Sequence, residues 1–181
     1  PPPRSSSAAS DVYKRQYVVS ESLGIGAVPP TVIRDGPLGV GSVQWFVDAD
    51  HSEHYFTIYE SRDDLHDQLR GIAILDLAAN NTDRKSGHCL LAYDHVWAID
   101  NGLCFSADYK LRTVIWDFGG EPIAAQHREA LANLADHPPE ELDELLDRHE
   151  IEALRERCRL TAELGEFPTD ETGHRYPWPL V

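Results

Sequence analysis

The spacing of hydrophobic and polar residues predicts short strands mainly in the first half of the chain and helices mainly in the second. Residues 31–33 and 42–47 are apolar runs separated by a turn-forming Asp-Gly-Pro and further glycines, which predicts a hairpin. An apolar stretch at 17–23, closed by Gly24, predicts a short helix before the hairpin. The clearest helix lies at 63–79, where apolar residues recur every three or four positions.

A second hairpin follows this helix after a polar loop. Residues 89–92 and 96–99 are apolar and flank Tyr-Asp-His, an arrangement typical of two antiparallel strands joined by a tight turn. A short strand is also predicted at 113–116, and Gly119-Gly120 ends that region.

The rest of the chain is predicted to be helical up to a proline-rich end. Leucine-rich periodicity places helices at 123–135, 139–147 and 149–164, with acidic residues on the solvent side. The final Tyr-Pro-Trp-Pro-Leu-Val cannot form a helix, and we expect its aromatic side chains to pack back on the domain.

Residues 1–16 differ from the rest of the chain in composition. They contain Pro, Ser and Ala with a short basic end, and they lack an apolar period. They resemble a cloning or sequence-assembly remnant, so we expect a non-native or disordered tail. The folded domain is therefore expected at 17–181, and the native chain is expected to begin before Tyr17.

Composition excludes several classes of protein. A hydrophobic content of 41% suffices for a packed core, but no apolar run is long enough for a transmembrane segment. The formal charge of −15 argues against nucleic acid as a partner, because phosphate backbones are bound by clustered lysine and arginine. The three cysteines are widely spaced and form no metal or disulfide motif, so a cytoplasmic location is expected.

The second hairpin brings three polar residues together. His88 precedes its first strand and Asp100 follows its second, so the open end of the hairpin makes them neighbours. Asp83 lies five residues before His88 in the same loop. Phosphoryl transfer needs a carboxylate beside the acceptor hydroxyl and further ligands for the metal that bridges the nucleotide phosphates. The three positions match the catalytic-loop Asp, the second metal ligand and the metal-binding Asp of kinases.

Each of these residues also has a structural interpretation. Asp83 and Asp100 could stabilise turns, as Asp often does, and His88 could be a hydrogen-bonded structural histidine. Asp76 lies within the apolar helix, where its expected role is to satisfy buried groups of the following loop. Lys85 could contact a phosphate as a point charge or be solvated.

Several motifs resemble known kinases. Asn81-Thr82-Asp83-Arg84 and, later, Asp100-Asn101-Gly102 are similar to type II phosphatidylinositol 4-kinases and to secretory-pathway kinases. The wider pattern, including Val-Pro-Pro-Thr at 28–31 and the Tyr-Pro-Trp-Pro-Leu ending, resembles a bacterial, mainly actinobacterial family of phosphatidylinositol 3-/4-kinase-like proteins. This likeness extends over residues 17–181.

The resemblance implies roles for individual residues. Asp83 would be the catalytic base, and Arg84 would be the second catalytic residue, supporting the loop. Asp76 and Asn81 would give structural support. Asp100 and His88 would hold the metal. Residues of the strand at 42–47 would contact the adenine of ATP, and the closest would be Gln44, Trp45, Phe46 and Val47. Because His88 stands where such kinases have Asn, the metal could be Mg²⁺ or Mn²⁺.

The expected fold is therefore α+β and protein-kinase-like, represented mostly by the helical C-lobe with a short hinge hairpin and with the N-lobe largely missing. The expected reaction is ATP- and metal-dependent phosphoryl transfer to a hydroxyl of a lipid headgroup, a protein or a small molecule. The truncated chain alone is expected to be inactive. The alternatives are a pseudokinase that binds nucleotide or acts as a scaffold, a nucleotidyl (AMP) transferase, and a purely structural helical protein.

Overall fold

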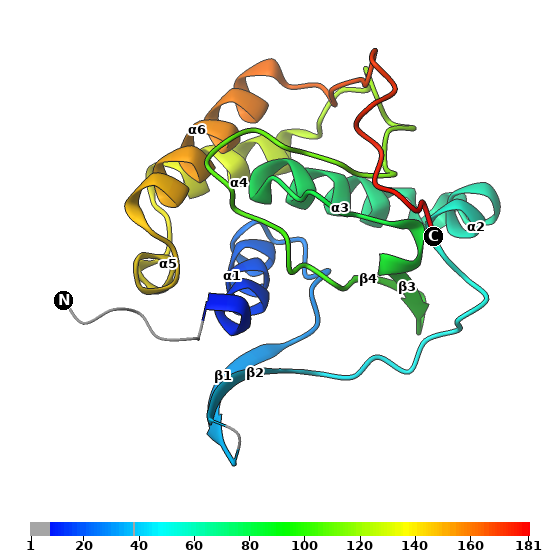
Figure 1. The fold of residues 1–181 in the computed structure, drawn as a ribbon. Coiled ribbons are helices and arrows are strands. Elements are labelled where there is room, and N and C mark those ends of the chain that lie inside the picture. Colours follow the sequence, from blue (N-terminus) through cyan, green and yellow to red (C-terminus); the bar gives the residue numbers. More distant parts are fainter. Residues whose placement is uncertain (1–7, 38) are drawn as a thin grey trace.

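The computed structural model describes residues 8–37 and 39–181 and shows a body of helices from which one hairpin projects (Figure 1). In chain order the elements are α1 Ala8–Ser22, β1 Thr31–Gly36, β2 Gly39–Gln44, α2 Tyr55–Ser61, the 3₁₀ turn Asp63–Leu65, α3 His66–Ala79, the 3₁₀ turn Ser86–His88, β3 Cys89–Ala92, β4 His95–Ala98, α4 Ala125–Asp136, α5 Glu140–Leu145 and α6 Arg148–Leu164. Both two-stranded sheets are antiparallel, as predicted. No helix in the described residues has the length and apolar character needed to cross a membrane.

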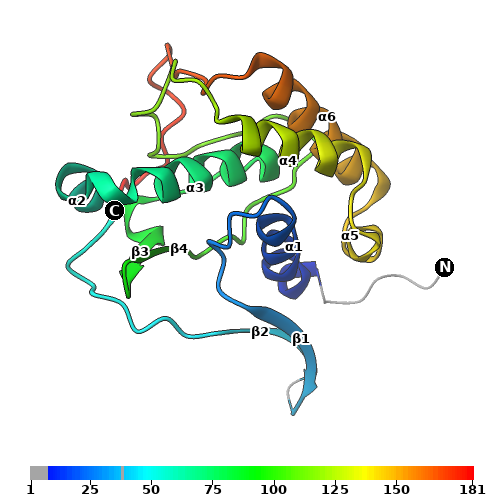
Figure 2. The same ribbon diagram turned by 180° about the vertical axis from the view of Figure 1, so that it is seen from behind.

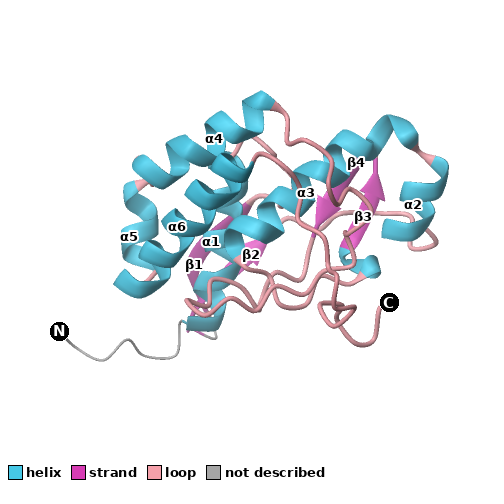
Figure 3. Ribbon diagram, turned by 90° about the horizontal axis from the view of Figure 1, so that it is seen from above, coloured by secondary structure: helices cyan, strands magenta, loops and turns pink. Residues whose placement is uncertain are grey.

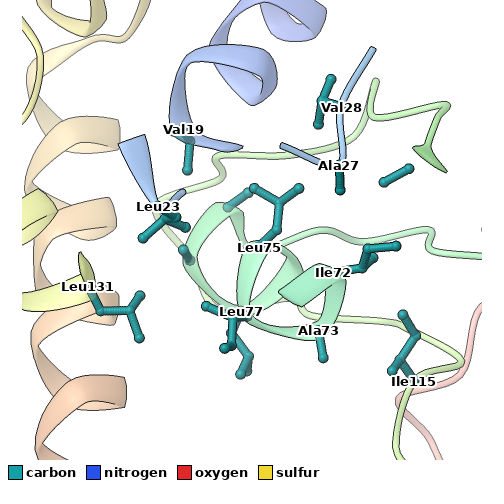
Figure 4. Packing of buried hydrophobic residues seen from close by; sticks show 14 of the residues in the cluster. Val19, Leu23, Ala27, Val28, Ile72, Ala73, Leu75, Leu77, Ile115 and Leu131 are labelled. Carbon is teal, nitrogen blue, oxygen red and sulfur yellow. The ribbon is translucent and has the colours of Figure 1, made fainter. Parts of the chain in front are cut away.

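The core is built around α3, which is buried on nearly every side. Ile72, Leu75 and their neighbours lie between α1 on one side and α4 on the other, with Ile115 from the later loop closing a third side (Figure 4). From behind, α4 and α6 run alongside α3 (Figure 2). A helix surrounded in this way needs an apolar sequence around its whole circumference, which the Gly-Ile-Ala-Ile-Leu run supplies. α3 thereby holds the loop that follows it in a fixed position.

The β3–β4 hairpin confirms the second predicted hairpin. Cys89 pairs with Ala98 and Ala92 pairs with His95, so the strands end together. Tyr93 and Asp94 have φ values of 56° and 57°, which are the left-handed conformations of a tight two-residue hairpin turn. The hairpin thus brings His88 and Asp100 to its open end.

The β1–β2 hairpin also forms, but its second strand is shorter than predicted. Thr31 pairs with Gln44 and Gly36 pairs with Gly39, and β2 ends at Gln44 instead of continuing to Val47. Trp45 still donates its N–H to Pro30 O (2.9 Å), but the ladder ends there because the two prolines before Thr31 have no N–H to donate in return. Residues 45–54 leave as a loop that connects the hairpin to α2.

The N-terminal segment differs most from expectation. α1 begins at Ala8, so residues 8–16 extend the helix predicted at 17–23 and lie within the fold; residues 1–7 lie outside the described part of the chain. Lys14 pairs with Glu141 (3.0 Å) and Arg15 with Glu150 (3.6 Å). Gln16 is fully buried, yet neither polar atom of its carboxamide has a partner among the described residues, an unfavourable arrangement.

The C-terminal half confirms the three predicted helices within a few residues. α6 begins at a capping box in which the Asp147 carboxylate accepts the N–H groups of His149 and Glu150. The predicted strand at 113–116 is reduced to one parallel bridge between Arg84 and Thr113. The expectation that the terminal aromatic residues pack back is wrong for Trp178, which is 89% exposed. The segment itself still lies on the domain, because Pro177 is buried and Leu180 O accepts the Ser86 N–H (2.8 Å).

Candidate active site

The candidate catalytic loop begins where α3 ends. Asn80 adopts a left-handed conformation (φ 52°), and its buried side chain bonds the carbonyls of Ser106 and Asp108 and the N–H of Lys110. Asparagine tolerates this conformation better than most residues, because its short amide can hydrogen-bond locally. The chain therefore turns sharply at Asn80 and enters residues 81–88 in a direction fixed by the 106–110 segment.

A buried ion pair holds this loop against α3. Asp76 and Arg84 both have fully buried side chains, and Arg84 Nη2 lies 2.9 Å from Asp76 Oδ1, while Nε contacts both carboxylate oxygens at 3.2 and 3.0 Å. Asn81 Nδ2 (2.9 Å) and Thr113 Oγ1 (3.3 Å) donate to the same carboxylate. A buried charge pair is tolerated when such additional hydrogen bonds satisfy it. Asp76 and Asn81 therefore both bond within the framework beneath the loop.

Arg84 also links the catalytic loop to the segment that carries Asp100. Its Nη1 donates to Ile99 O (2.8 Å), and its Nη2 donates to Asn101 Oδ1 (2.7 Å). Arg84 is fully buried, so its guanidinium is positioned to organise the loop and not to contact a substrate. The sequence pattern placed Arg84 in the loop but indicated neither the contact with Thr113 nor the burial of Asn101. Thr113 carried no local signal, whereas Asn101 lay inside the Asp-Asn-Gly motif.

The three candidate chemical groups lie at the surface of this framework. Asp83 has 29% of its side chain exposed, and its Oδ2 lies 3.6 Å from Lys85 Nζ. His88 Nε2 lies 3.3 Å from Asp100 Oδ2. Asp100 has a positive φ of 52°, a conformation unusual for a residue with a side chain and common at functional sites. The hydroxyl of Tyr13, from α1, also hydrogen-bonds Asp100, and burial followed by the Asp100 charge raises the Tyr13 pKa.

The surroundings of His88 favour a neutral ring. Burial lowers its pKa below the ordinary value and the Arg84 charge adds to this, whereas Asp100 and Asp83 act in the opposite direction. Nδ1 accepts the Lys85 N–H (3.3 Å), so in the neutral ring the proton sits on Nε2, facing Asp100. A cation at Nε2 would require that proton to move to Nδ1 and the Lys85 contact to open.

The donor set suits a nucleotide-bound metal better than a metal held by protein alone. Within residues 8–37 and 39–181, no group of three or more His, Cys, Asp or Glu side chains is arranged to hold a metal ion. Mg²⁺ is commonly held by one or two carboxylates, with substrate phosphates and water completing its shell. Asp100 can supply such an oxygen, because more than half of its side chain is exposed.

The loop after β2 lies against the face of the β3–β4 hairpin that carries Leu90 and Trp97. Leu90 and Trp97 are cross-strand partners and are both partly buried. Trp45 packs edge-on against Trp97, with ring centroids 5.8 Å apart, and Asp50 N–H donates to Leu91 O (3.2 Å). The loop therefore connects the two hairpins beside the candidate catalytic residues.

The predicted nucleotide contacts differ in exposure along this loop. Gln44 donates to Thr31 Oγ1 (3.0 Å), and Val47 is nearly buried. Phe46 is 76% exposed and Trp45 is 59% exposed, so their side chains present an apolar edge to solvent.

Two comparisons of the sequence with known proteins show which family the chain is related to. The sequence profile described as "Phosphatidylinositol 3- and 4-kinase" matches residues 34–164, more than half of the chain. The chain belongs to this family. It is also similar to Protein Rv2133c of Mycobacterium tuberculosis, with 36% identity over 201 aligned positions that cover 90% of this chain and 72% of that protein.

Membership of the phosphatidylinositol 3- and 4-kinase family implies a fold for the chain, and the matched region contains the candidate site. The fold is kinase-like, with mixed helices and small antiparallel sheets. The matched region includes α3, the loop with Asp83 and Arg84, the β3–β4 hairpin and Asp100. The sequence resemblance to a bacterial branch of this family is therefore confirmed.

Proposed function

We propose that this chain belongs to an ATP- and divalent-metal-dependent phosphotransferase that moves a phosphoryl group to a hydroxyl acceptor. The observation that carries the proposal is the fully buried Arg84, which bonds α3, the catalytic loop and the Asp100 segment at once. The contacts of this one side chain thus link the backbone segments that carry Asp83 and Asp100. Preorganised groups of this kind lower the barrier to phosphoryl transfer mainly through position and electrostatics.

Each residue has a proposed role. Asp83 orients the acceptor hydroxyl and takes up its proton, and Lys85 offers a positive charge 3.6 Å from Asp83. Asp100 and His88 hold the metal–nucleotide, with His88 in the tautomer that frees Nε2. The metal supplies charge neutralisation at the phosphates when bound. The acceptor oxygen bonds to the γ-phosphorus of ATP, the bond from that phosphorus to the β,γ-bridging oxygen breaks, and ADP leaves.

The remaining parts of the proposal concern domain organisation and location. Residues 17–181 would form the hinge and C-lobe, with the backbone of 44–47 meeting the adenine and Leu90 and Trp97 beneath it. The free thiols of Cys89 and Cys158 are buried, which is compatible with a reducing, cytoplasmic setting.

Calorimetric titration with ATP tests the proposal, first with Mg²⁺ and then with Mn²⁺. It should be done on the full-length parent protein, with Asp100→Asn beside it. Asp136→Asn is a matched control, because Asp136 is an exposed carboxylate on α4. We expect metal-dependent binding that is lost in Asp100→Asn and kept in the control. A preference for Mn²⁺ would support His88 as a ligand.

Turnover is then assayed by the mass added to candidate acceptors. A phosphate supports phosphoryl transfer, whereas an added AMP group would replace it by nucleotidyl transfer. Metal-dependent binding without any transfer would favour a pseudokinase. Absence of ATP binding in the intact protein would refute the kinase proposal.

A further inference from the structure

A cleft of about 190 Å³ with mainly apolar walls lies between α6 and the end of α3. Its lining includes four hydrophobic or proline side chains, one tyrosine and one arginine: Leu77, Leu160, Leu164, Pro168, Tyr109 and Arg157. We call this the Arg157 cleft. No residue of its lining belongs to the 81–88 loop. Seen from above, α6 runs beside α4, and loops gather along the side of the molecule where the C-terminal segment lies (Figure 3).

The cleft collects hydrophobic side chains that the fold leaves in solvent. Leu160 and Leu164 are one turn apart on α6, so they share a face of that helix, and they are 48% and 71% exposed. The core face of α6 is formed by other residues, among them Cys158 and Ala162, which are buried. Tyr109 is also exposed. Exposed apolar side chains that gather around a hollow, instead of being scattered singly, indicate a binding surface.

Arg157 supplies the positive charge of the cleft. Its Nε donates to Ala78 O (2.9 Å) in the last turn of α3, and its Nη1 donates to Ser106 O (3.2 Å). These bonds account for two of the five N–H groups of a guanidinium. Nη2 is shielded from solvent and has no hydrogen-bond partner among the described residues. Burial lowers the pKa of this guanidinium, and the charges that oppose the shift are those of Cys158, Cys104 and Tyr109, none of which is a carboxylate.

The other polar groups of the cleft do not neutralise Arg157. Thr161 Oγ1 donates to Arg157 O (2.8 Å), which occupies that hydroxyl. Glu166 belongs to the lining, but it is exposed and forms no ion pair with Arg157. The Arg175 guanidinium stacks over the Tyr109 ring (5.1 Å), so a second cation lies beside the cleft. A buried donor without a partner is unfavourable, and an anion that reaches it recovers that loss.

We propose that the Arg157 cleft binds a small hydrophobic monocarboxylate, with the carboxylate on the Arg157 guanidinium and the hydrocarbon part against Leu160 and Leu164. A single guanidinium matches a charge of −1, and its parallel N–H groups match the two oxygens of a carboxylate. Because Nη2 is shielded, the carboxylate reaches it when the side chain shifts outward, and the longer bond, to Ser106 O, is the one that such a shift lengthens. This inference does not depend on the proposed phosphotransferase function.

The volume of the cleft limits the length of the ligand. A water molecule occupies ~30 Å³ in the liquid and a methylene group is of similar size, so 190 Å³ holds roughly six carbon groups. Each methylene that enters the apolar lining should raise the affinity about fourfold. The gain should stop once the chain extends beyond the cleft into solvent.

The experiment titrates the full-length parent protein with butanoate, hexanoate, octanoate and decanoate, followed by saturation-transfer NMR. Hexan-1-ol is the uncharged counterpart of hexanoate. Arg157→Gln removes the cation, and Leu160→Glu places a like charge in the cleft while leaving the Arg157 hydrogen bonds intact. The matched controls are Arg148→Gln, at an 87% exposed arginine of α6, and Val40→Glu, at an exposed valine of β2. Circular dichroism verifies that each variant is folded.

We expect hexanoate to bind in preference to hexan-1-ol, and the affinity to level off between hexanoate and octanoate. Hexanoate affinity should fall about tenfold in Arg157→Gln, as for loss of a hydrogen bond to a charged group. It should also fall in Leu160→Glu, through repulsion between carboxylates, and stay unchanged in both controls. If Arg157→Gln does not fold, because α3 loses its contact with Arg157, the Leu160→Glu result decides.

Three results would overturn the proposal. Equal binding of hexanoate and hexan-1-ol, or binding of neither, would show that Arg157 does not hold a carboxylate. Full hexanoate affinity in Leu160→Glu would place the ligand elsewhere. A wild type that dimerises and becomes monomeric in Leu160→Glu, without binding hexanoate, would assign the exposed leucines to a second copy of the chain. The ATP titration is separate, so its failure would leave this site standing.

Discussion

Replacing Arg84 by methionine should uncouple the catalytic loop from the rest of the fold. The substitution keeps an unbranched apolar stem but removes the guanidinium bonds to Asp76, Ile99 O and Asn101. Asp76, fully buried, would lose its counter-ion and keep only the Asn81 and Thr113 donors. Breaking a buried ion pair from one side costs about 3–5 kcal/mol.

The expected destabilisation is large enough to measure by thermal or urea unfolding followed by circular dichroism. For a chain of this size, 1 kcal/mol corresponds to roughly 2–4 °C, so the melting temperature should fall by roughly 6–20 °C. The double variant Asp76→Asn/Arg84→Met removes the unpaired charge and keeps an acceptor for Asn81 and Thr113. It should recover roughly 2 kcal/mol of the loss.

Measurement of metal–ATP binding separates the contribution of Arg84 to stability from its contribution to the position of the Asp100 segment. The double variant should be more stable than Arg84→Met yet still bind metal–ATP poorly, because nothing then holds Asn101 and the Asp100 segment to the loop. Arg148→Met, on the exposed surface of α6, should change stability by less than ~0.5 kcal/mol. An Arg84→Met variant that melts close to the wild type, or a double variant with full ATP affinity, would refute the role assigned to this ion pair.

Two further predictions concern buried side chains near the site. Tyr55→Phe removes the hydrogen bond to Asp117 Oδ2 (2.7 Å) from a fully buried ring and should cost about 1–2 kcal/mol, measured by urea unfolding; an unchanged midpoint would contradict it. Burial raises the pKa of Cys89 to about 12, so its thiol should resist iodoacetamide at pH 8 in the native protein and react after unfolding, as read by peptide mass spectrometry. Rapid native labelling of Cys89 would show that the β3–β4 hairpin opens.

Local sequence patterns were enough to predict both hairpins and the helices other than α2, which lies in a segment with no clear period. The long apolar run of α3 and the two short apolar runs on either side of the Tyr-Asp turn are patterns that extend over only a few positions. The two strands of an antiparallel hairpin begin and end side by side at the end opposite the turn. The closeness of His88 and Asp100, which flank the hairpin, could therefore also be predicted. Residue composition was a poorer guide at the N-terminus, where residues 8–16 form part of α1.

The sequence by itself determined most of the elements that form, and it made Asp83, His88 and Asp100 the candidates for the chemistry. Only the tertiary structure decided that Arg84 is a buried link between three segments, that Thr113 pairs with it, and that Trp178 faces solvent. These facts depend on the bridge between residues 84 and 113 and on the C-terminal bonds to Ser86 and Thr113. Contacts between segments so distant in sequence leave no periodic signal, because they are selected by packing of the whole core.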